Sequence, residues 1–192
     1  MVNKLSVHAT KPLRTCGKTY AHYSSFKPFL RNDFNGRCGY CDDEDFHAGG
    51  TRGFQIDHFK PKSKFEELKH DYSNLVYSCP FCNRAKWDKW ENNKGFIDPC
   101  NKDYDEHLFR NKLGKIRYET PQGQYIFEEL NLGLERHEIL WLIRKIDIQK
   151  QLLRERIRTL KKGHDDRVEA LEQFLKIQDL VDQYTQLFRD SI

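Results

Sequence analysis

The fold of this chain is decided between residues 38 and 83, where the sequence reads Cys38-Gly39-Tyr40-Cys41, then Ile56-Asp57-His58, then Cys79-Pro80-Phe81-Cys82-Asn83. In each Cys-x-x-Cys pair, a tight turn can present two thiolates to one metal ion. Four thiolates are the ligand set of a closed tetrahedral zinc site. We therefore predict a structural Zn²⁺ ion bound by Cys38, Cys41, Cys79 and Cys82.

Two other uses of Cys-x-x-Cys have to be weighed against this one. A redox motif needs a single pair, whereas here two pairs flank one compact motif. A zinc deaminase combines His-x-Glu with Pro-Cys-x-x-Cys. None of the eight histidines has glutamate two residues later, and proline follows Cys79 instead of preceding it. Both alternatives are therefore disfavoured, and Cys16 and Cys100 are treated as ordinary thiols.

Composition bounds the remaining possibilities. The 192 residues suffice for one domain, or for a small domain with an appendage, and only 38% of them are hydrophobic. A modest core with a charged surface and some stabilisation from a metal is expected. The net charge of +4 is compatible with a nucleic-acid partner. No apolar run reaches the about 20 residues of a membrane span, and the N-terminus lacks a signal peptide, so we expect a cytoplasmic protein.

Hydrophobic periodicity predicts an α+β fold. Residues 54–58 alternate apolar and polar and predict a strand, the short segment 75–77 predicts a second one, and Pro80 is placed to begin a helix. Other expected elements are a short helix near 26–30, a loop over 42–53, a second hairpin with strands at 115–118 and 124–127, and a helical hairpin over 134–190. The chemistry would then lie at a strand end and in the first turn of a helix.

The residues enclosed by the cysteines suit phosphodiester hydrolysis. That reaction needs a base to activate water and a cation to neutralise charge on phosphate. His58 is a candidate base, because neutral imidazole is available near pH 7. Asp57 and Asn83 offer oxygen ligands for a divalent cation. Asn74 can hold the loop backbone or orient the imidazole. An isolated Asp-His pair is usually an exposed polar pair without a function. Here the pair is followed along the chain by Asn74, Asn83 and a cysteine adjacent to Asn83.

The motifs Asp57-His58-Phe59-Lys60-Pro61, Asn74-Leu75-Val76 and Cys79 to Lys86 resemble those of the HNH endonucleases, also called His-Me finger or ββα-metal nucleases, in their zinc-stapled form. The resemblance covers about residues 36–99. It implies His58 as general base, Asp57 and Asn83 as ligands of one catalytic cation, and Asn74 as the residue that positions the base-bearing loop. Trp87 stands where some members have a further histidine ligand and cannot coordinate a metal, which favours Mg²⁺ or Mn²⁺ completed by water.

A weaker resemblance extends beyond these motifs. Asp57-His58-Phe59-Lys60-Pro61-Lys62-Ser63, Phe96-Ile97-Asp98-Pro99 and Leu130-Asn131-Leu132 are similar to segments of the HNH subunits of Septu and retron-type anti-phage systems. Those subunits work beside an ATPase partner. The resemblance therefore implies a bacterial defence role and a possible ATPase partner.

Basic and aromatic residues surround the predicted site. Contacts to phosphates are predicted for four of them, namely Lys60, Lys62, Arg84 and Lys86. Trp87 and Trp90 are expected to be core or interface anchors instead of platforms for base stacking.

The sequence thus predicts an N-terminal arm (1–23), an HNH nuclease domain with its zinc knuckle (24–133) and a C-terminal helical hairpin (134–192). The predicted activity is metal-dependent hydrolysis of DNA. A non-catalytic zinc-stapled module that binds nucleic acid or protein is the alternative from another class, and an RNase using the same site is a third possibility, because no residue reports on a 2′-hydroxyl.

Overall fold

The structure is a computed structural model that describes residues 4–92 and 95–190. The chain divides into two compact units, residues 1–134 and residues 135–192. The first unit carries all the motifs quoted above.

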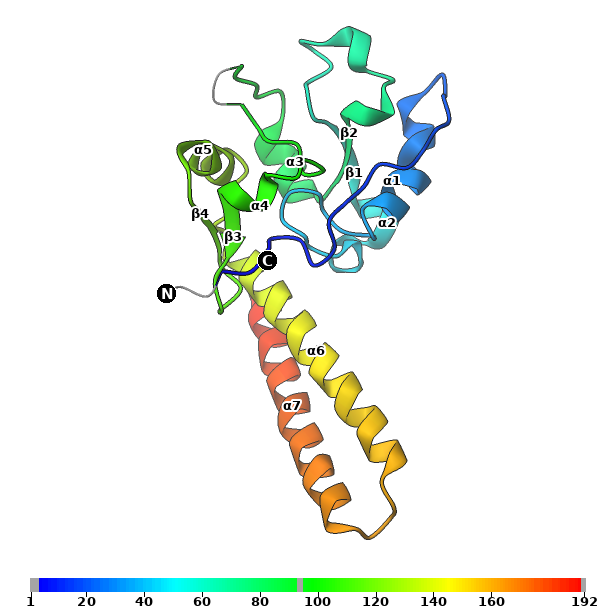
Figure 1. Cartoon of the computed structure of the whole chain (residues 1–192), viewed down its shortest axis with the longest axis vertical. Helices are drawn as coiled ribbons and strands as arrows, with labels where there is room; N and C mark the ends of the chain where they lie inside the picture. The colour runs from blue at the N-terminus through cyan, green and yellow to red at the C-terminus, as the bar shows by residue number, and fades with distance from the viewer. Residues whose placement is uncertain (1–3, 93–94, 191–192) are drawn as a thin grey trace. The chain divides into compact units, whose positions relative to one another are not determined.

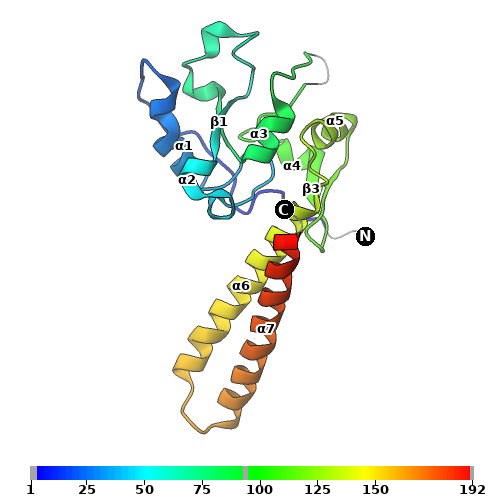
Figure 2. The same cartoon turned by 180° about the vertical axis from the view of Figure 1, so that it is seen from behind.

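A two-stranded antiparallel sheet and one helix form the centre of the first unit. Strand β1 (Gln55–His58) pairs with β2 (Leu75–Ser78) so that Asp57 lies opposite Val76 and His58 opposite Leu75. Helix α3 (Pro80–Lys86) follows β2 directly, with Pro80 in its first turn, where a missing N–H costs no helical hydrogen bond. Figures 1 and 2 both show α3 beside β1. The predicted ββα core is thus confirmed.

The first cysteine turn packs directly on this core. The Gly39 N–H donates to the Tyr77 carbonyl at 2.8 Å. A Cβ atom on Gly39 would lie 2.6 Å from the Phe34 ring and 2.7 Å from the Val76 side chain. Phe34 follows helix α1 (Lys27–Asp33), which contacts β2. Gly39 is therefore needed for the close approach of the turn to the strand.

The segment 42–53, expected as a loop, contains short helical turns. A 3₁₀ helix, η2 (Asp45–Ala48), leads into the four-residue helix α2 (Gly50–Gly53). Gly49, between them, and Gly50, the first residue of α2, have φ angles of +81° and +66°. Other single turns of 3₁₀ helix are η1 (Tyr23–Phe26), η3 (Glu66–Leu68) and η4 (Tyr72–Asn74).

The expected hairpin of 115–118 with 124–127 is wrong. Strand β4 (Ile116–Tyr118) pairs instead with the preceding β3 (Leu108–Arg110), which follows the short helix α4 (Tyr104–His107). Residues Pro121–Glu129 form helix α5, whose first turn is capped by the Thr120 hydroxyl accepting from the Gly123 N–H. Thr120 as N-cap and Pro121 in the first turn favour a helix here, although Pro121-Gln122-Gly123 also fits a turn between two strands. A Cβ on Gly123 would lie 2.1 Å from the His107 carbonyl oxygen, so this helical glycine is a packing requirement.

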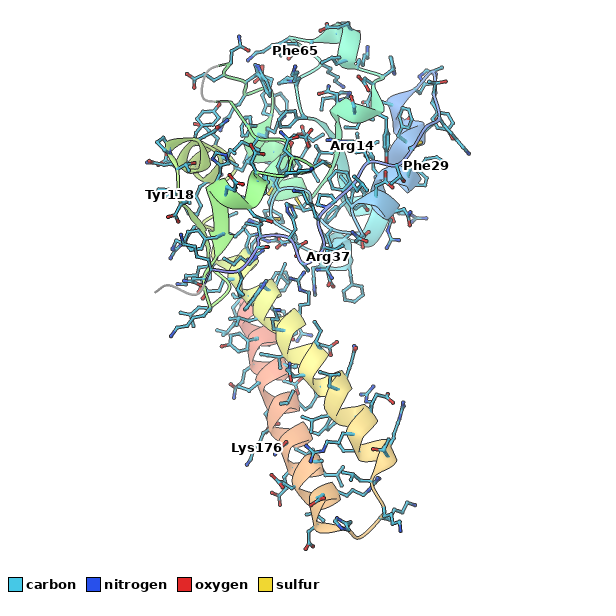
Figure 3. All side chains as sticks on the ribbon, in the orientation of Figure 1. Arg14, Phe29, Arg37, Phe65, Tyr118 and Lys176 are labelled. Atoms are coloured by element: carbon cyan, nitrogen blue, oxygen red, sulfur yellow. The ribbon has the colours of Figure 1, made fainter. Side chains whose placement is uncertain are left out.

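The N-terminal arm lies on the first unit with most of its residues exposed and is anchored there at a few points. Leu5 pairs with Arg110 as an extension of the β3–β4 sheet, and Val7 is fully buried. The Arg14 side chain, labelled in Figure 3, donates from Nε to the Leu75 carbonyl at 3.0 Å and from Nη1 to the Asp98 carboxylate at 2.9 and 3.0 Å. The arm therefore connects β2 to segments far along the chain.

The second unit is a helical hairpin, as the sequence predicts. Helices α6 (Glu135–Thr159) and α7 (Asp165–Asp190) run side by side in both ribbon views. Near the connection, Arg167 donates to the Leu160 carbonyl at 3.0 Å, and Ile157 and Ala170 are buried. Gly163, with φ +81°, makes the turn between the helices. Within residues 4–92 and 95–190, no helix has the length and apolarity to cross a membrane.

Candidate active site and metal cluster

The four predicted zinc ligands come together in one buried cluster. All four cysteine side chains are inaccessible to solvent, and their sulfur atoms lie within 4.8 Å of one another. The Cys41 and Cys79 sulfurs are 3.8 Å apart. Four sulfurs at about 2.3 Å from a central ion would be separated by about 3.8 Å, whereas a disulfide bond is about 2.05 Å. The cluster can therefore hold a metal ion such as zinc.

Backbone amides support the sulfurs in both knuckles. The Tyr40 N–H donates to the Cys38 sulfur, and the Cys82 N–H donates to the Cys79 sulfur, each at 3.4 Å. Cys79 is also the N-cap of α3, so the second knuckle is the first turn of that helix. This places Asn83, the residue after Cys82, one turn into α3.

A pocket of about 420 Å³ opens where β1 ends and α3 begins. Three segments line it: the end of β1, the loop that follows, and α3 with the residues after it. The lining residues are Ile56, Asp57, His58, Pro61, Lys62, Ser63, Asn83, Trp87 and Asp88. The fold thus brings Asp57, His58 and Asn83 together at one pocket, although 24 residues separate His58 from Asn83 in sequence.

The His58 ring is held in one orientation and in one tautomer. Its Nε2 lies 3.0 Å from the Lys69 carbonyl oxygen, which only accepts hydrogen bonds, so Nε2 carries the proton. In the neutral ring Nδ1 then has the free lone pair. Burial lowers the pKa of His58 below its usual 6.5, and the positive charges of Lys62 and Lys86 lower it further, against the hydrogen bond to Lys69. His58 is therefore neutral at pH 7 and is able to accept a proton.

Asn74 ties down the loop that follows His58. Its Oδ1 accepts from the Lys60 N–H at 2.8 Å, and its Nδ2 donates to the carbonyls of Lys60 at 3.0 Å and Leu68 at 3.3 Å. The Phe59 N–H also donates to the Asn74 carbonyl. Asn74 is buried and does not line the pocket. It bridges the two ends of the loop that carries Lys69, the partner of His58.

Asp57 is engaged in a buried ion pair. Its carboxylate accepts from the Tyr40 hydroxyl at 2.5 Å and lies 3.0 Å from the Lys86 ammonium, which also donates to the His58 carbonyl at 2.8 Å. Burial raises the pKa of Asp57, against the opposing effects of Lys86 and Tyr40, and lowers the pKa of Lys86. The pair joins the first knuckle, the end of β1 and α3.

The position of Lys86 corrects one sequence prediction. A surface contact to phosphate is expected for this residue, but its side chain is fully buried. Lys86 instead lies on the buried side of α3, where its ammonium is 3.0 Å from the Asp57 carboxylate. In this conformation the Lys86 ammonium binds the Asp57 carboxylate and the His58 carbonyl beneath the pocket, and it cannot reach a phosphate at the surface.

We expect Lys86→Met to reduce the free energy of unfolding by about 3 kcal/mol, because it leaves the Asp57 charge buried without its partner. Urea unfolding followed by circular dichroism measures this. Lys89→Met is the matched control, since its pair with Glu129 is partly exposed and worth under about 1 kcal/mol. The double variant Asp57→Asn, Lys86→Met should recover part of the loss. A Lys86→Met protein as stable as the wild type would mean that the ion pair is not formed.

The other predicted phosphate contacts differ in position. Lys62 lines the pocket and is exposed, and Arg84 is exposed on α3. The Lys60 ammonium lies 5.5 Å from the centre of the Phe65 ring and 6.0 Å from that of Trp90, at the loop whose Phe65 is labelled in Figure 3. Of the four predicted contacts, Lys62 and Arg84 are thus best placed to bind the phosphate backbone of a nucleic acid.

Tyr23 is a residue of the site that the motifs do not reveal. Its ring meets the His58 ring edge-on, with centroids 4.7 Å apart and an interplanar angle of 76°. Its hydroxyl accepts from the Lys62 ammonium at 3.3 Å. Tyr23 lies in η1, 35 residues before His58, so only the folded chain brings the two rings together.

The oxygen donors of the pocket fit a divalent cation. Asn83 donates from Nδ2 to the Gln55 Oε1, which leaves its Oδ1 as the acceptor. The Asp57 carboxylate has about four lone-pair directions, of which Tyr40 and Lys86 occupy only part. An amide oxygen and a carboxylate are donors that Mg²⁺ and Mn²⁺ accept. The neighbouring Lys86 charge would weaken the binding of such a cation.

Comparisons with known proteins agree with this geometry. The family model described as HNH endonuclease matches residues 38–89. The Septu protein PtuB of Bacillus mycoides (strain KBAB4) is 25% identical over 174 aligned positions, which cover 71% of this chain and 57% of that protein. The chain thus spans little more than half the length of this curated relative. No solved structure matches the chain. With its cysteine cluster, its ββα core and its Asp-His and Asn motifs, the segment 38–89 is an HNH endonuclease domain.

Proposed function

We propose that the chain is a metal-dependent endonuclease that hydrolyses phosphodiester bonds in DNA. The observation that carries this proposal is the state of His58. Its Nε2 is committed to the Lys69 carbonyl, its Nδ1 is free to act as a base, and its pocket is shared with the oxygen donors Asp57 and Asn83. This is the arrangement that a water-activating base beside a cation requires.

In the proposed mechanism, His58 Nδ1 removes a proton from a water molecule in the pocket. The oxygen of that water forms a bond to phosphorus as the bond to the 3′ oxygen breaks, and the leaving oxygen takes a proton from solvent. The products would carry 5′-phosphates. Asp57 and Asn83 would hold a divalent cation, which would supply positive charge to the phosphate. Lys62 and Arg84 position the flanking phosphates, and Asn74 keeps the loop with Lys69 in place.

The structural metal in this proposal is zinc. Four buried thiolates leave no open coordination position for a water molecule, and soft sulfur ligands select zinc over magnesium. The catalytic ion is Mg²⁺ or Mn²⁺, because the pocket offers oxygen donors and Trp87 is no ligand.

The test is a cleavage assay on labelled double-stranded DNA, single-stranded DNA and RNA, each with Mg²⁺, with Mn²⁺ and with neither. The proposal expects cleavage of DNA only when one of the two ions is present. A non-catalytic module would bind without cutting under any ion, and an RNase would cut only the RNA. Either of these results would contradict the proposal.

The pH dependence of cleavage follows from His58. Because its pKa lies below 6.5, the base stays neutral and the rate stays at its plateau from pH 7 to pH 8. As the pH falls through the lowered pKa, His58 takes up a proton and the rate should fall about tenfold per pH unit. Single-turnover rates between pH 4.5 and pH 8 measure this limb. A midpoint above pH 7 would contradict the burial of the ring.

We further propose that this nuclease serves bacterial anti-phage defence in the cytoplasm, beside an ATPase subunit. The support is the similarity to the Septu protein PtuB, together with the Septu-like motifs around His58 and at 96–99 and 130–132. Purification of the tagged chain from its native host, followed by mass spectrometry, tests the partner. Recovery of the chain without any ATPase would count against this role.

A further inference from the structure

Trp87 is an exposed aromatic side chain at the edge of the pocket. Its side chain is 75% exposed, and it lines the same pocket as His58, Asn83 and Lys62. Of the two expected roles of Trp87, core anchor or interface anchor, this exposure excludes the core. Because the ring shares this pocket with the candidate base and a candidate cation ligand, a molecule bound in the pocket would cover it.

Trp90, three residues later, shows what a packed tryptophan looks like in this region. Its ring meets those of Phe59 and Phe65 edge-on at 5.4 and 5.7 Å, and its indole N–H donates to the Asn92 Oδ1 at 2.8 Å. One tryptophan of this segment is thus half-buried in an aromatic cluster, and the other is exposed at the pocket.

The backbone places the Trp87 ring at this edge. Trp87 ends α3 with φ 49° and ψ −121°, a combination that a bulky residue rarely adopts. Its N–H still donates to the Asn83 carbonyl at 3.0 Å, so the residue is fixed one helical turn after the proposed cation ligand. An unfavourable conformation kept at a candidate active site points to a role for the side chain.

The surroundings favour a nucleobase over an apolar protein surface. Lys62 lines the pocket beside Trp87, and Arg84 is exposed on the same helix. A strand of nucleic acid places a flat apolar base next to charged phosphates, which an indole ring in the same pocket as Lys62 can match. An apolar protein partner would have to cover Lys62 and Asp88, which line the same pocket, and remove their charges from water.

We propose that Trp87 stacks on the nucleobase next to the scissile phosphate, and that this base is unpaired. The proposal rests on the nuclease function proposed above and specifies its substrate. In a duplex both faces of a base are covered by its neighbours, whereas in a single strand one face is open to an aromatic ring. Trp87 therefore selects single-stranded DNA, or an unpaired segment, at the position of the cut.

The first experiment measures binding without cutting. In a His58→Ala background, tryptophan emission is followed while single-stranded or double-stranded DNA of the same sequence is added. Stacking should quench the emission with the single strand. Trp87→Ala should remove this quenching and weaken single-strand binding by about 5- to 100-fold, with less than about 3-fold change for the duplex. Trp87→Phe, which keeps an aromatic face, should retain most of the affinity.

Trp90→Phe is the matched control, because its ring packs within the protein. It should leave both the quenching and the affinity for single strands near the wild-type values. Equal losses on both DNA forms after Trp87→Ala, or unchanged binding to both, would overturn the proposal. Unchanged binding to both forms would instead be expected if Trp87 docks a protein.

The second experiment measures kcat and KM for cleavage of the two DNA forms by proteins that keep His58. Trp87→Ala should raise KM for the single strand and remove the preference for it. The two experiments separate the inference from the function on which it rests. Binding of single strands that depends on Trp87 in a chain that cuts nothing would support stacking and contradict only the nuclease activity.

Discussion

His58→Ala is expected to lower the rate of DNA cleavage by about 10²- to 10⁴-fold at pH 7.5, because it removes the base that activates water. The ring contributes little elsewhere: its described contacts are with the Lys69 carbonyl and the Tyr23 ring. The remaining oxygen donors and cations should therefore still bind DNA and metal. Single-turnover cleavage of a labelled oligonucleotide with Mg²⁺ or Mn²⁺ measures the loss.

Two controls make this result specific. His70→Ala removes an exposed histidine whose ring lies 6.2 Å from that of Tyr23, and it should change the rate by less than about threefold. Added imidazole should restore part of the activity of His58→Ala by occupying the place of the missing ring. If His58→Ala cut DNA as fast as the wild type, His58 would not be the base.

Cys82→Ser and Cys38→Ser are each expected to abolish stable folding of the first unit. Zinc binding supplies about 10 to 16 kcal/mol in small structural sites, which is comparable to the entire stability of a domain. The cluster also lies in the core, where all four thiols are inaccessible to solvent. Circular dichroism and metal analysis should show a loss of structure together with a loss of about one zinc ion per chain.

Cys16→Ser is the control for these two variants. Cys16 is half-buried and lies outside the four-sulfur cluster, so its replacement should leave the zinc content unchanged. A wild-type protein that is well folded and contains no zinc would contradict the assignment of the cluster.

The metal cluster and the pocket are joined by very short stretches of chain. Tyr40 lies between Cys38 and Cys41 and donates its hydroxyl to Asp57, while Asn83 follows Cys82. A change in the position of either knuckle therefore moves a donor of the pocket. A metal ion bound by the four cysteines would therefore fix the geometry of the pocket without taking part in the proposed reaction.

Local sequence signals predicted the elements that lie close together along the chain. The alternation at 54–58, the short segment 75–77, Pro80 at a helix start and the helical rhythm after 134 all correspond to observed elements. The hairpin at 115–127 is wrong because the partner of β4 precedes it, and because the Thr120 cap with Pro121 begins a helix. Strand pairing depends on contacts between different segments, and the local sequence of one segment does not identify its partner.

The sequence by itself determined the four clustered cysteines, the ββα core and the HNH motifs, since these depend on the types of residue and their spacing. Only the tertiary structure decided what each side chain faces. It turned Lys86 inward to Asp57, brought Tyr23 from the N-terminal arm onto His58, and left Trp87 exposed while packing Trp90. The reason is that burial and pairing arise from segments distant in sequence, whereas a motif records only its own neighbours along the chain.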